Sequence, residues 1–478
     1  MWGVLIASAV AFISTVQDPD FWWHVRIGQW MVQNGRLPSH DLFTYTVPGN
    51  VWTDHEYVTE VLMYLAYRAG GAAAVSLGFG AVSWLGLYAV YRTCEPERRP
   101  YVIVGLVLLL AVLAGEPIWG PRAQMLEFSF TALLLYWLQG YLSGRSRAIV
   151  WFPLVMVVWA NTHGSFVVAF AFLGAALAAE GARWALDRSS RVHRDRFWVL
   201  AAVFVASAAA MLVTPHGPGF VLYPLRTQGS AAQQLLIQEW LSPDFHAAYL
   251  RPFEAMLLVL VVGFAVRRPS LYELLVSLIA VALALESQRH IALFVAACTP
   301  VVVASWSAGW TQVARRLRPR LRGGKAPRGA AVVTAVALAL IGVASAVKVA
   351  SDLSTQARVT AASYPVGAAT WLAAHPGVGT RMFNQYGWGG YLVERFYPQP
   401  DRRVFIFGEA ELMGDSMLYR YNDLQTLRPD WRAILDRYRV DYVVFNHGAA
   451  LSNVLLTQPD WKRVYSDGVA DIFVRRQR

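Results

Sequence analysis

Long apolar segments alternate with short polar segments over roughly the first 350 residues of the chain. A membrane-spanning helix needs about 20 mostly apolar residues, and fewer when it is short or tilted. The first apolar segment has no basic residue before it and no small-residue cleavage site after it, so we expect a retained helix rather than a signal peptide. The pattern predicts about eleven spanning helices, at residues 2–17, 71–91, 101–115, 125–142, 149–161, 164–182, 197–213, 255–266, 270–285, 291–313 and 329–347.

The pattern changes near residue 348. Charged residues become denser, and strand-like runs at 403–407, 441–446 and 470–475 alternate with amphipathic helix-like runs. Such alternation is typical of a compact α/β domain. We therefore expect a mainly α fold: a polytopic transmembrane helix bundle at 1–347, with a long first outer loop at 18–70, followed by an extracytoplasmic α/β domain at 348–478.

Composition supports a membrane protein. Hydrophobic residues make up 56% of the 478 residues and charged residues only 15%, whereas soluble proteins carry about 25% charged residues. This excludes a cytosolic enzyme, a disordered chain and a secreted disulfide scaffold.

The net charge of +11 is explained by topology. Short cytoplasmic connections of membrane proteins are enriched in Lys and Arg. Alternate breaks at 92–100, 143–148, 183–196, 267–268 and 314–328 hold 19 of these residues, and the intervening breaks hold six. The bias predicts a cytoplasmic amino terminus and an extracytoplasmic carboxyl terminus, and it leaves no reason to expect nucleic acid as a partner.

Polar and ionisable residues recur in the predicted outer segments, whereas the span interiors are nearly free of charge. Charge beside a bilayer is costly, so its position is informative. Taken singly, each residue could be solvated or hydrogen-bonded at the interface, but as a set they predict one outward-facing cavity. The candidate site residues are Asp18, Asp20, His24, His55, Glu56, Arg122, Asn161, His163, His216, Arg289 and His290. Specifically, we expect Asp18, Asp20, His55 and Glu56 to share a cavity that Arg289 and His163 face.

The sharpest feature is Asp18-Pro19-Asp20, directly after the first predicted span. Two carboxylates at this spacing can bind a divalent metal, or one can act as a base while the other orients it. Asp18 and Asp20 are therefore the candidate catalytic residues and also the candidate metal ligands, with Mg²⁺ or Mn²⁺ as the candidate cofactor. No second Asp-x-Asp occurs in a later outer segment, which leaves metal dependence open.

The sequence resembles the C-type superfamily of membrane glycosyltransferases, which take sugars from polyprenyl-phosphate donors. The resemblance rests on the acidic first outer loop, the multispan bundle and the predicted carboxyl-terminal domain. It looks closest to bacterial members with motifs like those at 18–24, 52–56, 159–164 and 384–392. It implies a multi-pass protein of the bacterial plasma membrane.

The resemblance also implies a reaction. An acidic residue of the first loop acts as base toward an acceptor hydroxyl on a glycan, lipid or protein, and the polyprenyl phosphate leaves as the anomeric carbon inverts. Asp18 is the first candidate base and Asp20 the second. Arg122, Arg289 and His290 are candidates to hold the leaving phosphate, because guanidinium binds phosphate bidentately. The polar side chains available to hold the sugar are His55, Glu56, Asn161, His163 and His216, and His24 is a further candidate for substrate binding.

Two other functions stay open from sequence. A transporter or flippase of lipid-linked saccharides would need ionisable groups or broken helices near the midplane, which the apolar span interiors do not offer. A non-catalytic partner in envelope assembly, binding through the carboxyl-terminal domain, is compatible with the sequence.

Overall fold

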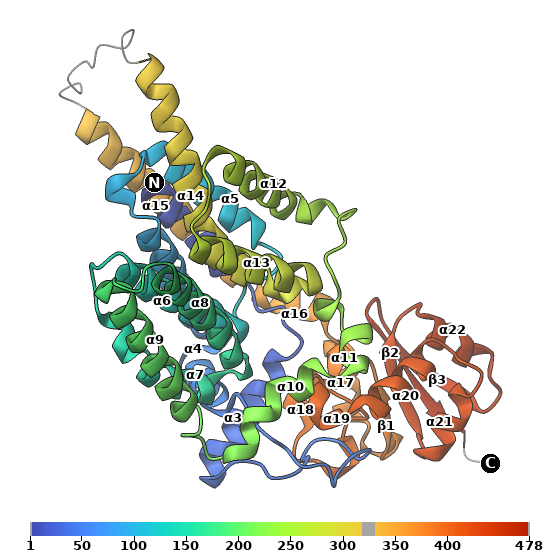
Figure 1. Ribbon diagram of the computed structural model, residues 1–478. Helices are drawn as coiled ribbons and strands as arrows, with labels where there is room; N and C mark the ends of the chain where they lie inside the picture. The colour runs from blue at the N-terminus through green and yellow to red at the C-terminus, as the bar shows by residue number, and fades with distance from the viewer. Residues whose placement is uncertain (1, 318–329, 477–478) are drawn as a thin grey trace. The chain divides into compact units, whose positions relative to one another are not determined.

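The computed structural model describes residues 2–317 and 330–476 (Figure 1). Most of the predicted basic connection at 314–328 lies outside these residues. The chain forms two compact units. The helical unit comprises Met1–Ser14, Ser76–Pro224 and Glu239–Asp352, and the mixed unit comprises Thr15–Val75, Leu225–Gln238 and Leu353–Arg478.

The helical unit is built from apolar helices around one core. Helix α13 packs on α14, α8 packs on α9, and α5 contacts both α12 and α14. Large side chains such as Phe128, Phe152, Trp159 and Phe294 are fully buried among them. The helices are α1 (Trp2–Ala7), α2 (Ala9–Phe12), the second part of α4 (Tyr57–Thr93), α5 (Tyr101–Ala114), α6 (Gln124–Leu142), α7 (Phe152–Thr162), α8 (Val168–Leu186), α9 (Arg191–Ala210), α12 (Arg251–Val266), α13 (Leu271–Glu286), α14 (Ile291–Leu317) and α15 (Ala330–Ser354).

The eleven predicted spanning segments fall largely on these helices. Within the described residues, five helical stretches are long and apolar enough to cross a membrane: Tyr57–Arg98, Gly164–Leu186, Ala248–Val266, Gln288–Ala314 and Val332–Ser354. Trp2–Phe12, Tyr101–Ala114 and Ala148–Thr162 are apolar but shorter. The count of eleven spans is therefore not confirmed, but the chain has the helices of a multi-pass membrane protein.

The mixed unit contains a four-stranded sheet with strand order β1-β2-β4-β3. Strand β1 pairs with β2 in parallel, while β4 pairs antiparallel with both β2 and β3. The strands are β1 (Met382–Asn384), β2 (Tyr442–Asn446), β3 (Trp461–Ser466) and β4 (Ala470–Arg475). The helices are α3 (Phe21–Asn34), the first part of α4, most of α10 (Tyr223–Gln228), α11 (Ala231–Leu236), α16 (Gln356–Ser363), α17 (Val366–Ala374), α18 (Gly389–Phe396), α19 (Ala410–Met413), α20 (Asp415–Gln425), α21 (Trp431–Arg437) and α22 (Ala450–Thr457).

The run at 403–407, predicted as a strand, is not one. Val404–Phe407 are buried, but the only regular pairing in this described run is an isolated bridge between Val404 and Thr44. The side chain of Asn384 takes the place of a neighbouring strand: its Oδ1 accepts from the Phe405 N–H at 2.7 Å, and its Nδ2 donates to the Ile406 carbonyl at 2.9 Å. The apolar pattern therefore indicated burial correctly. The backbone of this run forms hydrogen bonds with the Asn384 side chain rather than with a neighbouring strand.

Candidate functional site

The segment that carries the Asp-Pro-Asp motif is fixed by residues far along the chain. The backbone N–H of Val16 donates to Oε1 of Gln356 at 2.8 Å, and the amide nitrogen of Gln356 donates to the Val16 carbonyl at 3.0 Å. The hydroxyl of Tyr364 reaches the carbonyls of Gln17 and Asp18, at 3.2 and 3.1 Å. These contacts, all inside the mixed unit, hold residues 16–18 in one path into helix α3.

Asp18 and Asp20 form a partly exposed acidic pair at the start of α3. Oδ1 of Asp18 accepts from the backbone N–H of Asp20 at 2.9 Å. Oδ1 of Asp20 accepts from the indole N–H of Trp23 at 3.0 Å. One oxygen of each carboxylate is thus oriented by a hydrogen bond, and neither side chain is buried. Oriented, accessible carboxylates are what a general base requires.

Two glycines of the carboxyl-terminal part allow this turn to pack closely. A Cβ built on Gly408 would overlap Oδ1 of Asp20, and one built on Gly390 would lie 2.8 Å from the Pro19 carbonyl oxygen. A larger residue at 390 would meet the backbone of the turn, and one at 408 would force the Asp20 side chain to move. The motif around residues 384–391 therefore has a structural explanation: Asn384 holds the run that leads to Gly408, and Gly390 receives the Asp-Pro-Asp turn.

Beside this turn lies a buried group of side chains that we call the acid–histidine network. Nδ1 of His24 lies 2.9 Å from Oε1 of Glu60, and Nε2 of His24 lies 3.6 Å from Oε2 of Glu56. Oε1 of Glu56 lies 3.2 Å from Nε2 of His55. His24, Glu56 and Glu60 are buried, whereas His55 keeps some exposure. The members of the network are His24, Asp54, His55, Glu56, Glu60 and Glu409.

Burial gives the acids of this network unusual proton affinities. Asp54 is buried and hydrogen-bonded to Glu60, and burial raises its pKa to about 6. Because two hydrogen-bonded carboxyl groups need a proton between them, the Asp54–Glu60 pair holds one. Burial also raises the pKa of Glu409 to about 8, against the lowering effect of His55. The network therefore keeps protons that exposed carboxyl groups would lose.

His55 supplies the positive charge of the network. Burial alone would lower its pKa, but the neighbouring Glu56 carboxylate, helped by Glu409 and Asp54, raises the pKa of His55 to about 9. A charged His55 balances Glu56, which in turn lies between the two histidines. The network is thus a compensated buried cluster that fixes His24 and, through α3, the adjacent acidic turn.

The helical unit holds a second group, which we call the arginine cluster: Arg122, Gln124, Glu239, Trp240 and Arg289. Arg122 pairs with Oε1 of Glu239, and the Gln124 amide donates to its Oε2 at 3.2 Å. The Arg289 guanidinium stacks 4.4 Å from the centre of the Trp240 ring. Burial would raise the pKa of Glu239, but the charges of Arg122 and Arg289 lower it below its ordinary value. Two guanidinium groups thus act on one carboxylate.

The remaining predicted residues of the helical unit have structural partners. The amide of Asn161 donates to the carbonyls of Val157 and Val213, at 2.7 and 2.8 Å. Nδ1 of His163 lies 2.7 Å from the Ser165 hydroxyl and caps the short helix that follows. The ring of His216 packs on Phe220. His290, whose ring faces Trp240 edge-on, lies beside the arginine cluster.

The predicted site residues therefore fall into separate groups. Asp18, Asp20, His24, His55 and Glu56 belong to the mixed unit, and the others belong to the helical unit. Their convergence on one cavity stays a prediction.

The candidate residues drawn from sequence omitted Glu60, Glu239 and Glu409. Glu60 lies one helical turn after Glu56, a spacing that could have revealed it. Glu409 is about 350 residues from its neighbours in the network, and no local pattern marks it.

The metal-ligand prediction has no structural support. Among the described residues, no three His, Cys, Asp or Glu side chains are arranged to hold a metal ion. Instead, one carboxylate oxygen of Asp18 and one of Asp20 each accept a hydrogen bond from an N–H group. The donor set of the acidic turn does not by itself fit Mg²⁺ or Mn²⁺, which favour several oxygen ligands.

No protein-family model matches the sequence, and no curated protein does. Solved structures match in fold. The archaeal oligosaccharyltransferase AglB from Archaeoglobus fulgidus, in complex with an inhibitory peptide and a dolichol-phosphate, matches with a TM-score of 0.56 and 12% identity over 99% of this chain and 74% of that one. A structure of the Archaeoglobus fulgidus oligosaccharyltransferase tethered to an acceptor peptide by a disulfide bond matches with a TM-score of 0.52 and 12% identity over 99% of this chain and 74% of that one. ArnT from Cupriavidus metallidurans in the apo state matches with a TM-score of 0.51 and 14% identity over 98% of this chain and 96% of that one.

These similarities define the fold. The chain shares its fold with these oligosaccharyltransferase and ArnT structures, which agrees with the fold that the resemblance to the C-type superfamily implied. The similarity extends over nearly the whole chain, so both units belong to it. At 12–14% identity it defines the fold alone and not the reaction of this chain.

Proposed function

We propose that this protein is a membrane glycosyltransferase that moves a sugar from a polyprenyl-phosphate donor to a hydroxyl-bearing acceptor, which is a glycan, a lipid or a protein. The observation that carries the proposal is the accessible pair Asp18 and Asp20, held in a fixed turn within this fold. Structures of this fold contain a dolichol-phosphate and acceptor peptides, which is the combination of ligands that such a reaction needs.

Asp18 is proposed as the general base. Its carboxylate takes the proton of the acceptor hydroxyl while the acceptor oxygen bonds to the anomeric carbon of the sugar. Asp20, oriented by Trp23, is the alternative base or the group that orients the acceptor. Their partial exposure distinguishes them from the acids of the acid–histidine network, which are too buried to meet an acceptor.

The arginine cluster is proposed to receive the leaving phosphate. As the bond between the anomeric carbon and the phosphate oxygen breaks, the electron pair stays with the phosphate. Arg122 and Arg289 already neutralise the carboxylate of Glu239. A phosphate can replace that carboxylate as their partner, because guanidinium groups bind both anions in the same bidentate geometry.

The acceptor attacks as the phosphate departs, so the proposed reaction inverts the anomeric carbon. No step is assigned to a metal, since the residues of the turn do not form a metal site by themselves. Among the residues proposed to hold the sugar, His55 is the network member with exposed surface. His24 and Glu56 are assigned a positioning role instead.

The proposed location is the bacterial plasma membrane, with the amino terminus in the cytoplasm. The acidic turn and the carboxyl-terminal residues then face the extracytoplasmic side. The Lys and Arg bias of the connections supports this orientation.

To test this proposal, sealed vesicles that contain the protein are given a panel of labelled polyprenyl-phosphate sugars together with extracytoplasmic acceptor fractions. We expect at least one sugar to pass into an acceptor, with release of an equal amount of polyprenyl phosphate. Movement of the intact labelled lipid between leaflets, without release, would instead establish a flippase. If no donor gives either sugar transfer or movement of the intact lipid, the result would favour a non-catalytic partner in envelope assembly.

A further inference from the structure

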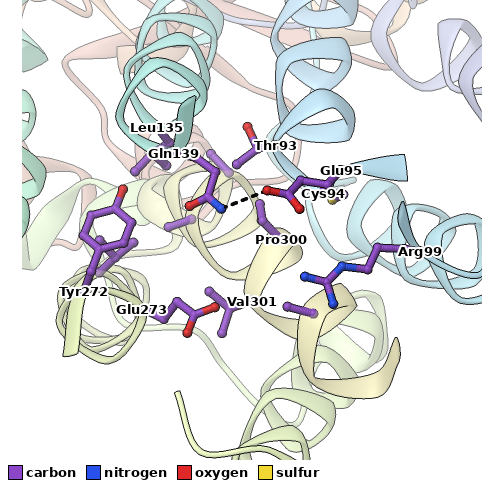
Figure 2. A pocket seen from close by; sticks show the side chains of 14 residues that line it. Thr93, Cys94, Glu95, Arg99, Leu135, Gln139, Tyr272, Glu273, Pro300 and Val301 are labelled. Carbon is purple, nitrogen blue, oxygen red and sulfur yellow. Dashed lines mark hydrogen bonds between the residues drawn. The ribbon is translucent and has the colours of Figure 1, made fainter. Parts of the chain in front are cut away.

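Several glutamine amides of this protein donate hydrogen bonds within the fold. In the small cavity of the helical unit drawn in Figure 2, the amide nitrogen of Gln139 donates to Oε1 of Glu95 at 3.4 Å. In the mixed unit, the amide of Gln356 donates to the Val16 carbonyl at 3.0 Å. The partners of these amides explain them structurally. The amide of Gln385 in the mixed unit is different.

Gln385 follows strand β1 directly and begins the turn of the motif at 384–392. Its Oε1 accepts a hydrogen bond from the backbone N–H of Trp388 at 2.9 Å. The indole N–H of Trp388 in turn donates to the Ser363 carbonyl at 2.9 Å. Because the Trp388 N–H needs an acceptor, these contacts determine which end of the Gln385 amide is the oxygen. The NH₂ group is the end that remains for another partner.

This NH₂ group is accessible. The side chain of Gln385 is half-buried, and its Nε2 makes no hydrogen bond to the part of the chain that the structure describes. Nε2 is also not enclosed by other atoms. A donor that water can reach costs little in the free protein, and a ligand that replaces the water can accept its hydrogen bond.

The amide of Gln385 lies beside the acidic turn. A Cβ built on Gly387 would lie 3.7 Å from Nε2 of Gln385 and 3.6 Å from Cβ of Pro19. Pro19 separates Asp18 from Asp20, so an accessible donor adjoins the residue between the two proposed bases. Because residue 387 is glycine, it has no side chain to fill the space between the amide and the proline.

The next residue of the motif brings a hydroxyl to the same turn. The hydroxyl of Tyr386 donates to the carbonyl of Gly408 at 3.3 Å, and the α-carbon of Gly408 lies against the carboxylate of Asp20. A phenolic oxygen that donates a hydrogen bond can also accept one. The motif therefore lines the acidic turn with groups that suit hydroxyls of a substrate.

A donor beside the base constrains the chemistry of the acceptor. The base must withdraw a proton from the attacking oxygen, whereas an N–H that donates to that same oxygen would make it a poorer nucleophile. The amide of Gln385 is therefore useful only to a second oxygen of the acceptor. A sugar ring has such an oxygen, because it carries hydroxyls on adjacent carbons. A serine or threonine side chain has a single hydroxyl.

We infer that Gln385 binds the acceptor and that this acceptor is a saccharide. Nε2 of Gln385 donates to the hydroxyl on the carbon next to the one that bears the attacking hydroxyl. The inference rests on the proposed function, and it selects a glycan from the acceptor classes named there.

Saturation-transfer NMR on the purified full chain tests binding without requiring transfer. The probes are methyl hexopyranosides, their monodeoxy analogues and N-acetylserine methylamide. We expect at least one methyl hexopyranoside to bind, and one of its monodeoxy analogues to bind about fivefold more weakly, which is the contribution of one neutral hydrogen bond. The serine derivative should not compete with the hexopyranoside.

Two substitutions separate the donor from the turn. Gln385→Glu keeps an oxygen for the Trp388 N–H but removes the donor, and Gln385→Met removes both without adding charge. Both variants should bind the hexopyranoside about fivefold more weakly. Both should also bind it and the discriminated deoxy analogue equally, because the missing hydroxyl has lost its partner. Gln399→Glu adds the same charge at an exposed position and should match the wild type.

Three results would overturn the inference. The first is unchanged saccharide binding in both variants. The second is a loss in one variant alone, which would assign the effect to the turn in Gln385→Met or to the added charge in Gln385→Glu. The third is binding of the serine derivative without binding of any hexopyranoside. The proposed function fails on a separate result, the absence of sugar transfer from every donor; saccharide binding that depends on Gln385 would then define a saccharide site without transfer.

Discussion

The carboxylate of Asp20 lies directly against the α-carbon of Gly408, close enough that a methyl group on residue 408 would occupy the place of its Oδ1. Nearly 390 residues separate the two positions in sequence. The proposed catalytic turn therefore depends on the carboxyl-terminal part of the chain for its exact shape. This dependence can be tested without altering either aspartate.

Gly408→Ala should lower sugar transfer by at least about tenfold, because the methyl group displaces the Asp20 side chain from the Trp23 N–H. Stability should change little, since the displaced group is the end of a partly exposed side chain. Gly468→Ala is the control, because a Cβ at 468 meets open space. Equal activity of the two variants would show that the position of Asp20 does not matter.

The acid–histidine network predicts that the stability of the fold decreases as the pH rises from about 4 to about 9. In the folded chain the pKa of Glu409 is about 8, against 4.5 ordinarily. A group whose pKa is raised by folding contributes stability that is complete below its unfolded pKa and is lost as the pH rises through its folded pKa. Asp54 and His55, with pKa values of about 6 and 9, act in the same direction.

Replacing the titratable carboxyl group of Glu409 by an amide tests this prediction. Thermal unfolding in detergent should show a melting temperature that falls between about pH 5 and pH 8, and Glu409→Gln should flatten that slope. One such group contributes about 1.4 kcal/mol for each pH unit. Asp430→Asn, at an exposed position, should leave the slope unchanged. An unchanged slope in Glu409→Gln would mean that Glu409 is ionised in the folded protein.

Arg289→Lys should raise the KM for the lipid donor by about tenfold. The substitution keeps the charge but loses the planar group that stacks on Trp240 and binds phosphate bidentately. Arg251→Lys is the control in the same unit, because Arg251 is exposed and forms an ion pair with Glu254 at the surface. An unchanged KM in Arg289→Lys would show that the arginine cluster does not bind the phosphate of the donor.

Cysteine labelling tests the orientation. A cysteine at residue 400 should react with a membrane-impermeant reagent in intact cells, whereas one at residue 320 should react only after permeabilisation. The two native cysteines, Cys94 and Cys298, are buried and should not react with the reagent. Labelling of both positions from the same side would refute the topology derived from the basic residues.

Sequence predicted the helices better than it predicted the site. The apolar segments fall on helices because burial and bilayer thickness act on composition directly. The acidic turn was found because Asp18 and Asp20 lie two residues apart in the sequence. Glu409 was missed because its importance arises from tertiary burial beside His55, which no local spacing encodes. The run at 403–407 was misassigned because the Asn384 side chain replaces a strand.

The central claim is that a carboxylate of the acidic turn takes the acceptor proton. The most direct measurement compares polyprenyl phosphate release by the wild type, Asp18→Asn, Asp20→Asn and the exposed control Asp430→Asn in the same vesicles. We predict that Asp18→Asn lowers the rate by about 100-fold or more while expression and melting temperature stay unchanged, and that Asp430→Asn matches the wild type. If only Asp20→Asn loses polyprenyl phosphate release, Asp20 would be the base. Full activity of both Asp18→Asn and Asp20→Asn would contradict the claim.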